Sequence, residues 1–476
     1  MQFISPVFFC SVPLVLVLYV FIKPKYRWLL LLTFSLFFVG WNRPYSLLVL
    51  LLFSGITFYC GLLIERLKSL RSMVFFIAIL LQASCLILLK YMESGLGGFR
   101  MSFRDEGYKT DMVLVVAGFS VYTLQHIAYL AAIYRGRIQA GTQLFRFLLF
   151  SSFFAKFNSG PFEEPENLIG QFNSPVIQQD SIVQGVQRIV LGLFKKMVLA
   201  DRLAPVVAEV FSGRSQQGSF TVATGVCLFT IQLYFDFSAY SDIAIGAAKL
   251  FGIELTENFN RPLLSRSISE FWRKWHISLY RLFSTYVYFP IVYFFRENGK
   301  LAVLTGIAAT FLASGIWHGI GQTFLIWSLL HALYLSLEYL RPKTRISWTR
   351  FVPANVHRIF SIGMTFALVC FSNLFFRSAD MTQARLLLTQ LVSSPFGGKG
   401  VMNGYFSALA GGGYEEALFN LFVTVFFVLA FLFLERGIHE RIQKSGNGFV
   451  QIFIMLIAIF TFGVFKSAGY FIYVQF

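Results

Sequence analysis

Long runs of apolar residues, separated by short polar stretches, are the main feature of the chain. Several of them approach the roughly 20 residues with which a helix crosses about 30 Å of hydrocarbon. They lie at Pro6–Ile22, Tyr45–Ile64, Met73–Leu89, Met112–Ile133, Ile359–Phe376 and Phe449–Phe465. Because polarity does not alternate every second residue, the runs predict helices and not barrel strands. We therefore predict an all-α, polytopic transmembrane helical bundle of about 11–13 membrane segments; short segments at Trp28–Trp41 and Leu282–Phe295 leave the count open.

The composition agrees with a bilayer as the main solvent. Of the 476 residues, 56% are hydrophobic and 18% aromatic, and the mean hydropathy is +0.66. A water-soluble core of this length could not bury so much apolar surface. No repeat or Pro/Gly/Ser-rich linker divides the chain, so residues 1–476 are predicted to form a single membrane domain.

The chain has a net charge of +17, from 40 Lys and Arg against 23 Asp and Glu. We interpret the basic residues as contacts to lipid headgroups that also set the orientation of the chain in the membrane. In a soluble protein such a charge would suggest nucleic acid, but here the basic residues fall into short loops between apolar runs, where they favour lipid headgroups and the cytoplasmic side. These loops are Lys23–Arg27, Arg66–Arg71, Arg135–Arg146, Lys249–Arg281 and Arg341–Arg358. We predict membrane lipid and no nucleic acid as a partner, with the N-terminus outside and the first helix retained.

Several common kinds of site find no support in the sequence. The five cysteines are scattered singly through apolar segments, without CxxC or Cys/His spacing, so neither a disulfide framework nor a metal site is predicted. There is also no GxSxG elbow, Walker A loop or HExxH motif. Serine hydrolase, ATPase and zincin chemistry are therefore not indicated.

Three polar stretches interrupt the apolar pattern: Glu93–Asp111, Asp242–Arg281 and Ala379–Glu416. The first reads as an exposed loop, and the third, with two glycine runs, reads as a long extracytoplasmic loop with one short helix. The second is unusually polar for a stretch between hydrophobic segments. We expect the chemistry of the protein there and in the apolar run that follows.

His318 is the first candidate catalytic residue. It lies in the sequence SGIWHGI, deep in an apolar run, with glycines that allow close backbone approach and with Trp317 as a flat wall. An imidazole with a pKa near 6.5 is largely neutral in such a site and suits a general base that takes a proton from a hydroxyl. A structural, hydrogen-bonded histidine fits the pattern as well.

His276 is the second candidate, in the sequence FWRKWHISL, where cations and indoles interleave at the edge of a membrane segment. One interpretation is an interfacial aromatic and basic belt that anchors a helix to headgroups. The other is a cationic rim that receives an anionic donor such as a nucleotide thioester, or that lines a tunnel to His318. The two are compatible.

The other ionisable residues give weaker signals. His331 follows His318 by three to four helical turns, while His126, His357 and His439 are interpreted as structural. Asp236 and Asp242 follow a strongly apolar run; capping a helix, binding a partner and orienting a catalytic imidazole all remain open for them.

A series of motifs in one order resembles the bacterial branch of the membrane-bound O-acyltransferases, which act on alginate, cellulose and peptidoglycan and, more distantly, in teichoic acid D-alanylation. The motifs span about residues 114–379. They are Gly118–Gly136, Gly192–Leu203, Gln232–Asp242, Leu250–Pro262, Ser269–Leu279, Ser314–Gly319 and Phe375–Ala379. The resemblance implies a funnel-shaped bundle that joins a cytoplasmic donor side to an extracytoplasmic acceptor side.

The resemblance also implies roles for single residues and for partners. It makes His318 and His276 the catalytic histidines of an O-acetyltransferase in the bacterial inner membrane, with acetyl-CoA or another acyl thioester as donor and no permanently bound cofactor. Candidate substrate-binding residues are Trp317, Gly319, Trp272, Arg273, Trp275, Asp236 and Asn258. Implied partners are an SGNH-type extracytoplasmic acetyltransferase and a polysaccharide synthase or export complex.

The sequence departs from the family pattern beside the presumed tunnel. Ser284 and Thr285 stand where the family usually has an Arg-Asp pair, and Pro290–Phe294 replaces a glycine-rich turn. These differences argue against assigning alginate in particular as the acceptor. A transporter or flippase and a scaffold of a polysaccharide-export complex are the alternative functions; the first predicts inverted repeats, which the sequence does not show.

Overall fold

The computed structural model describes the chain in ten ranges, and every regular element in them is a helix. The ranges are residues 3–41, 44–93, 116–141, 144–173, 175, 178–212, 218–341, 353–393, 414–443 and 449–465. The only β-type pairing in these ranges is an isolated bridge between Phe259 and Trp275. The prediction of an all-α membrane protein is confirmed. Of the expected polar loops, Glu93–Asp111 lies almost entirely outside the described residues. Ala379–Glu416 contains the expected short helix, α17 (Met381–Leu391), whereas its two glycine runs fall in residues 394–413, outside the described ranges.

Six helices in the described ranges are long and apolar enough to cross a membrane. They are α3 (Pro44–Arg66), α4 (Arg71–Glu93), α10 (Ser219–Lys249), α14 (Lys300–His318), α15 (Gln322–Leu340) and α16 (Ala354–Arg377). Shorter apolar helices are α1 (Pro6–Phe21), residues 422–435 of α19 (Tyr414–Gln443) and α20 (Phe449–Phe462). The chain is therefore a multi-pass membrane protein, and the total of 11–13 segments stays a prediction.

The remaining helices are shorter. They are α2 (Arg27–Gly40), α5 (Phe119–Tyr134), α6 (Leu144–Ser152), α7 (Pro165–Asn173), α8 (Gln179–Phe194), α9 (Asp201–Val210), α11 (Ile268–Lys274), α12 (Ile277–Phe283) and α13 (Phe289–Phe294). Two π-helical turns extend neighbouring helices, η2 (Lys195–Ala200) after α8 and η4 (Ser284–Tyr288) after α12. Single turns of 3₁₀ helix lie at Pro24–Tyr26, Pro262–Leu264 and Arg296–Asn298.

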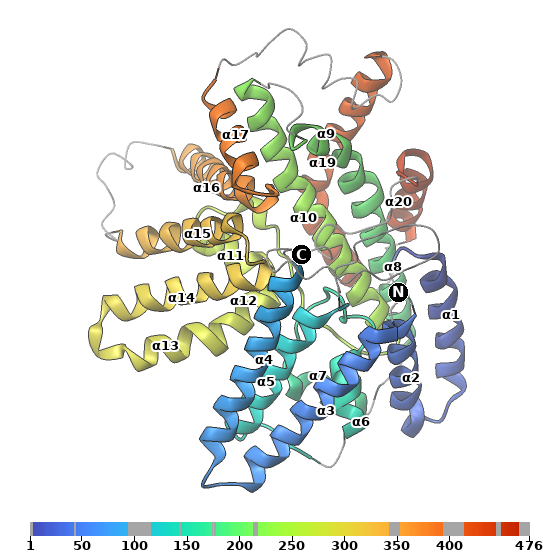
Figure 1. Cartoon of the computed structure of the whole chain (residues 1–476). Helices are drawn as coiled ribbons and strands as arrows, with labels where there is room; N and C mark the ends of the chain where they lie inside the picture. Colours follow the sequence, from blue (N-terminus) through green and yellow to red (C-terminus); the bar gives the residue numbers. More distant parts are fainter. Residues whose placement is uncertain are drawn as a thin grey trace, which may run out of the picture.

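Helix α10 is the central element of the bundle (Figure 1). In its most apolar 18-residue window 61% of the residues are buried, against 28% for α3 and 17% for α4, whose faces are open to lipid. Helix α8 packs against α10 at small residues: a Cβ on Gly192 would lie 2.7 Å from the Ala239 carbonyl oxygen. Such close backbone approach stabilises helix pairs in membranes, where the hydrophobic effect between helices is weak.

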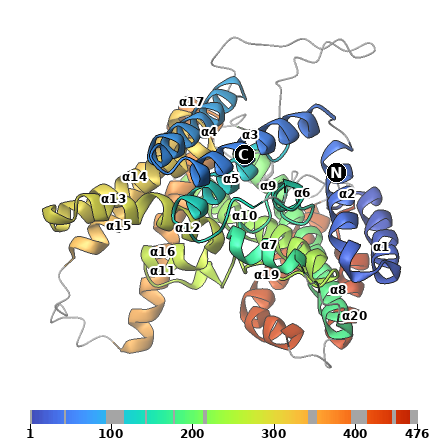
Figure 2. The same cartoon turned by 90° about the horizontal axis from the view of Figure 1, so that it is seen from below.

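Two groups of helices lie on opposite sides of α10 in both views (Figures 1 and 2). One group contains α8, α20, α1 and α2. The other contains α13, α14 and α15, which extend away from the bundle and carry exposed apolar side chains such as Phe294 and Leu333. Helices α11 and α12 connect α10 to this second group, so the polar stretch Asp242–Arg281 lies at the junction of the two.

Candidate active site

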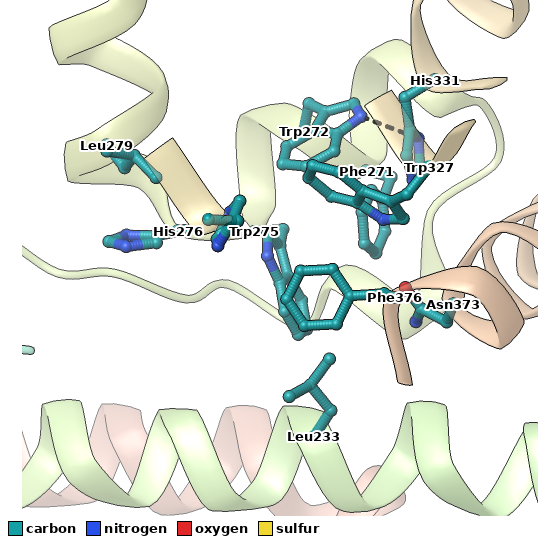
Figure 3. A pocket seen from close by; sticks show the side chains of 11 residues that line it. Leu233, Phe271, Trp272, Trp275, His276, Leu279, Trp327, His331, Asn373 and Phe376 are labelled. Carbon is teal, nitrogen blue, oxygen red and sulfur yellow. Dashed lines mark hydrogen bonds between the residues drawn. The ribbon is translucent and has the colours of Figure 1, made fainter. Parts of the chain in front are cut away.

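A cavity of about 20 Å³, room for about one water molecule, lies where α10, α11, α12, α14, α15 and α16 meet (Figure 3). Aromatic rings form most of its wall, and three of these rings are the imidazoles of histidines. The lining residues are Leu233, Phe271, Trp272, Trp275, His276, Leu279, His318, Trp327, His331, Asn373 and Phe376. The structure thus brings both predicted catalytic histidines to one cavity, together with Trp272 and Trp275.

His276 stands at the junction of α11 and α12 in a strained backbone conformation. Its φ of 45° and ψ of 54° lie in the left-handed region, which costs a residue other than glycine about 1–2 kcal/mol. The neighbouring pairing of Phe259 with Trp275 and the hydrogen bond from the Ile277 N–H to the Asn258 carbonyl (3.0 Å) hold the turn in place. Strain that the surrounding structure maintains is typical of functional sites.

Asn258 determines the tautomer of His276. Its Oδ1 atom accepts from the Ser278 N–H (3.2 Å) and the Ser278 hydroxyl (2.6 Å), and it lies 3.3 Å from His276 Nδ1. An oxygen that already faces a backbone N–H is an acceptor, so the imidazole nitrogen beside it carries the proton. His276 is therefore protonated on Nδ1, and its Nε2 is the unprotonated nitrogen. Asn258, predicted as a substrate-binding residue, is placed by the structure as the support of His276.

Burial keeps His276 neutral. The side chain is 2% exposed, and loss of hydration lowers the pKa of His276 well below its usual range, with a smaller contribution from the charge that His318 can carry. The rings of Phe237 and Phe162 cover it, with centroids at 4.7 and 5.8 Å. A neutral imidazole with Nε2 unprotonated is a hydrogen-bond acceptor at physiological pH.

His318 is the last residue of α14 and is surrounded by aromatic rings. The centroids of Trp317, Trp327 and Phe376 lie at 4.7, 5.2 and 5.2 Å from its own. Gly319 ends the helix, and a Cβ at this position would lie 2.6 Å from the Phe324 ring. Phe324 is itself stacked on His318 with centroids 6.4 Å apart. Gly319 therefore contributes by allowing Phe324 to approach the imidazole.

Trp317 lies beside the cavity and joins it to α5. Its indole N–H donates to the Ser120 carbonyl (3.3 Å), and its ring packs on Phe162 at 6.2 Å. Phe162 belongs to the segment between α6 and α7, and its N–H donates to the Ser278 hydroxyl (2.9 Å). This segment contacts His276 and Trp317, the residue before His318, but was missed by sequence reasoning, because its phenylalanine carries no chemical signal.

Two of the predicted substrate-binding residues lie away from the cavity. Arg273 is exposed on α11, and its guanidinium donates to the Ser269 hydroxyl at 2.6 Å. Asp236 is buried on α10, where its carboxylate pairs with Lys196 at 2.8 Å; Lys196 also pairs with Asp201 at 2.7 Å. For Asp236 the structure thus shows an ion pair within the bundle, and the roles that the sequence left open for it stay predictions.

Asp242 belongs to a cluster of charges that we call the ion-pair network: Arg188, Lys195, Asp242, Glu257 and Glu435. The Asp242 carboxylate accepts from Arg188 at 2.6 Å and pairs with Lys195 at 2.8 Å. These side chains line a second, smaller cavity together with Asn258. The network therefore lies directly behind the residue that holds His276. Sequence analysis had marked Asp242 but not its partners, which come from α8 and η2.

The described residues thus form a multi-pass helical membrane protein whose interior holds three buried histidines in an aromatic cavity. No group of three or more potential metal-ligating side chains occurs among them. A model of the membrane-bound O-acyltransferase family matches residues 138–376, within the range that carries the sequence resemblance. The chain belongs to this family.

Curated relatives agree with the family. A protein of Azotobacter vinelandii named probable alginate O-acetylase AlgI is 34% identical over 346 residues, 71% of this chain and 68% of the relative. The peptidoglycan O-acetyltransferase of Helicobacter pylori is 31% identical over 403 residues, 78% of this chain and 74% of the relative. The teichoic acid D-alanyltransferase of Bacillus subtilis is 26% identical over 266 residues, 53% of this chain and 66% of the relative. The predicted activity is confirmed at this level: the chain is an acyltransferase.

Proposed function

We propose that this acyltransferase moves an acetyl group from a thioester donor on the cytoplasmic side of a bacterial inner membrane toward an exported cell-surface polysaccharide or peptidoglycan. The observation that carries the proposal is the meeting of His276 and His318, from different elements, on one cavity inside a membrane protein of this family. The named activities of the alginate and peptidoglycan relatives support an O-acetyl transfer. The departures at Ser284 and Thr285 argue against alginate as the specific acceptor.

In the proposed reaction a hydroxyl oxygen attacks the thioester carbonyl. His318 takes the hydroxyl proton as the new C–O bond forms, the C–S bond then breaks, and the imidazolium returns the proton to the leaving thiolate. The products are an ester and a thiol, with no net change in protons. The aromatic wall excludes water, which protects the thioester from hydrolysis and strengthens the electrostatic interactions of the imidazole.

His276 has a different part in this proposal. Because Asn258 holds its Nδ1 proton, its Nε2 atom is a fixed acceptor that orients an O–H or N–H group of a substrate. The exposed Arg273 and the basic stretch around it suit the approach of an anionic thioester such as acetyl-CoA. Transfer through an SGNH-type extracytoplasmic acetyltransferase, beside a polysaccharide synthase or export complex, is part of the proposal and is suggested by family resemblance alone.

The first test measures ester-linked acetate in the cell-surface polysaccharide and peptidoglycan fractions of cells that lack the gene. These cells are complemented with the wild type, with His318→Ala, or with His357→Ala, which alters an exposed histidine near the start of α16. Loss of a general base costs about 10²–10⁴-fold in rate. We expect acetate from the wild type and His357→Ala but almost none from His318→Ala, at equal protein levels in the membrane.

Two outcomes would contradict the proposal. Equal acetate with His318→Ala and wild type would remove His318 from the chemistry and favour a scaffold. Unchanged acetate in every fraction, whether the gene is present or absent, would exclude acetyl transfer and favour another acyl group or a transport function. The fraction that changes identifies the acceptor.

A further inference from the structure

A third histidine, His331 on α15, lines the same cavity and is 1% exposed. It has two hydrogen-bond partners. The Trp272 indole N–H lies 3.3 Å from His331 Nδ1, and the Ser372 hydroxyl on α16 lies 2.9 Å from His331 Nε2. Figure 3 shows the first bond crossing from Trp272 to His331 at the edge of the cavity. The three residues come from three helices: α11, α15 and α16.

The direction of each bond follows from the chemistry of the partners. An indole N–H can only donate, so His331 Nδ1 accepts and is unprotonated. The Ser372 hydroxyl donates to the backbone carbonyls of Leu368 (3.1 Å) or Val369 (3.0 Å) and therefore accepts from His331 Nε2–H. Both ring nitrogens of His331 are then engaged within the protein. Neither nitrogen of His331 is therefore available as a base toward a substrate.

The bond to His331 fixes the Trp272 indole as a wall of the cavity. Trp272 packs edge-on against Phe311 and Trp327, with centroids at 5.2 and 6.0 Å. His331 itself lies edge-on to Trp272 at 5.0 Å and to Trp327 at 5.2 Å. A change at His331 would therefore release the one polar atom of Trp272 and remove a ring from behind the wall, while leaving His276 and His318 in place.

We propose that His331 is a positioning residue that holds Trp272 against the cavity and so restricts the acyl group to a short one. The inference rests on the proposed function and adds the residue that selects the length of the transferred acyl chain. The cavity of about 20 Å³ has room for about one water molecule, so an acyl group enters only with displacement of the wall, and each further methylene requires a larger displacement of Trp272. A packed apolar wall discriminates about 10- to 200-fold between substrates that differ by one methylene.

The test uses cells that lack the gene, complemented with the full chain and grown with butyrate so that acetyl and butyryl thioesters are both present. Mild alkali releases ester-linked acyl groups from the surface fraction, and mass spectrometry gives the ratio of butyrate to acetate. His331→Leu removes both hydrogen bonds, and we expect the ratio to rise about tenfold or more relative to the wild type. His331→Gln offers an oxygen to Trp272 and an N–H to Ser372, and we expect it to restore a ratio close to that of the wild type.

A second variant keeps the proposal testable if His331→Leu fails to accumulate. Trp272→Phe retains a ring but lacks the indole N–H, so we expect it to raise the ratio as well. Combining it with His331→Leu should add little to either single change, because both variants break the same bond. His126→Leu serves as the matched control: His126 is equally buried but bonds to Thr57 and Ser151, away from this cavity. It should lower protein levels without changing the ratio.

The outcomes separate this inference from the proposed function. If the wild type yields no ester of any kind, the proposed function is wrong. If the wild type yields acetate and the ratio is the same in His331→Leu, Trp272→Phe and the wild type, the function stands and the role of His331 is overturned. A ratio that rises equally in His126→Leu would also overturn it, because general loosening of the bundle would then explain the effect.

Discussion

Two polar regions inside the bundle, the aromatic cavity and the ion-pair network, keep polar groups in an apolar interior in different ways. In the network Arg188 and Lys195 each have a carboxylate oxygen of Asp242 within 2.8 Å. In the cavity, by contrast, His276 and His331 are neutral, and the other polar atoms belong to His318, to Asn373 and to indoles. A buried charge needs an immediate counter-charge, whereas a neutral imidazole can stay buried and still present a lone pair. The paired charges therefore suit structural support, and the neutral rings suit chemistry.

Asn258 is the residue at which the two regions meet. Its amide oxygen faces His276 and Ser278, and its Nδ2 donates to the Ser241 hydroxyl at 3.3 Å, one residue before Asp242 on α10. It also lines the small cavity of the ion-pair network. Any shift of α10 against α8 would therefore move the support of His276. The comparison suggests breaking each region separately and asking which property of the protein changes.

The largest loss of stability is expected from Asp242→Asn, which removes the anion shared by Arg188 and Lys195 without changing side-chain volume. Removing one partner of a buried ion pair costs about 3–5 kcal/mol, and the anions left to the two cations are the half-exposed Glu257 beside Arg188 and Glu435 at 3.8 Å from Lys195. We expect a marked fall in the amount of protein in the membrane and in the melting temperature of the purified protein in detergent. Any protein that does fold should retain acetate transfer per molecule.

The opposite result would change the interpretation of the network. If Asp242→Asn accumulated normally and melted like the wild type but lost all acetate transfer, the network would belong to the catalytic machinery. Arg188→Met with Asp242→Leu is the matched control, since it removes both charges of a pair whose two side chains are buried. It should be less destabilising than Asp242→Asn alone, as expected when an ion pair is replaced by apolar side chains.

The sequence predicted the helices and the two candidate catalytic histidines better than the residues that support them. Apolar runs that lacked alternation predicted the helices, and the high cost of burying an ionisable group led to His318 and His276. The partners of Asp242 could not be predicted, because Arg188 lies 54 residues earlier in the chain and only the packing of α8 on α10 brings the two together. Lys195 and Lys196, cations between apolar residues, were the signal that could have indicated the network.

His331 and Asn258 show a second limit of sequence reasoning. A buried histidine is equally compatible with a base, a structural residue and a support, and the partners of its ring nitrogens decide between them. Those partners, Trp272 and Ser372 for His331, lie 59 and 41 residues away on other helices. The family resemblance implied that Asn258 binds substrate; the structure adds that its side chain supports His276, which lies 18 residues later in the chain.

A smaller loss of stability, together with a loss of acetate transfer, is expected from Asn258→Leu. It removes the acceptor of the Ser278 N–H and hydroxyl and of His276 Nδ1, and a buried donor without a partner costs about 1–3 kcal/mol. We expect acetate transfer per molecule to fall about tenfold or more, with a modest decrease in melting temperature. Wild-type transfer by this variant would show that the tautomer of His276 is irrelevant to the reaction.

Asn258→Asp sharpens the same prediction through its pH dependence. The carboxylate keeps an acceptor beside His276 Nδ1, but its negative charge raises the pKa of the imidazole, which burial holds low in the wild type. His276 then remains protonated up to a higher pH. We expect the acid limb of acetate transfer, measured in membrane vesicles, to move to higher pH in Asn258→Asp. An unchanged pH profile would count against His276 as a neutral acceptor in the reaction.

The smallest effect is expected from Glu257→Gln at the outer edge of the ion-pair network. Glu257 lies 2.5 Å from Arg188, but its side chain is 44% exposed, so water already screens the pair. Arg188 also keeps Asp242 at 2.6 Å, and the buried cation is therefore never left without an anion. We expect a cost of about 1 kcal/mol or less, seen as a small shift in melting temperature. If Glu257→Gln lost as much stability as Asp242→Asn, the anion that compensates the network's cations would be Glu257, at its exposed end. The packing of α8 on α10 would then depend on an ion pair at the surface.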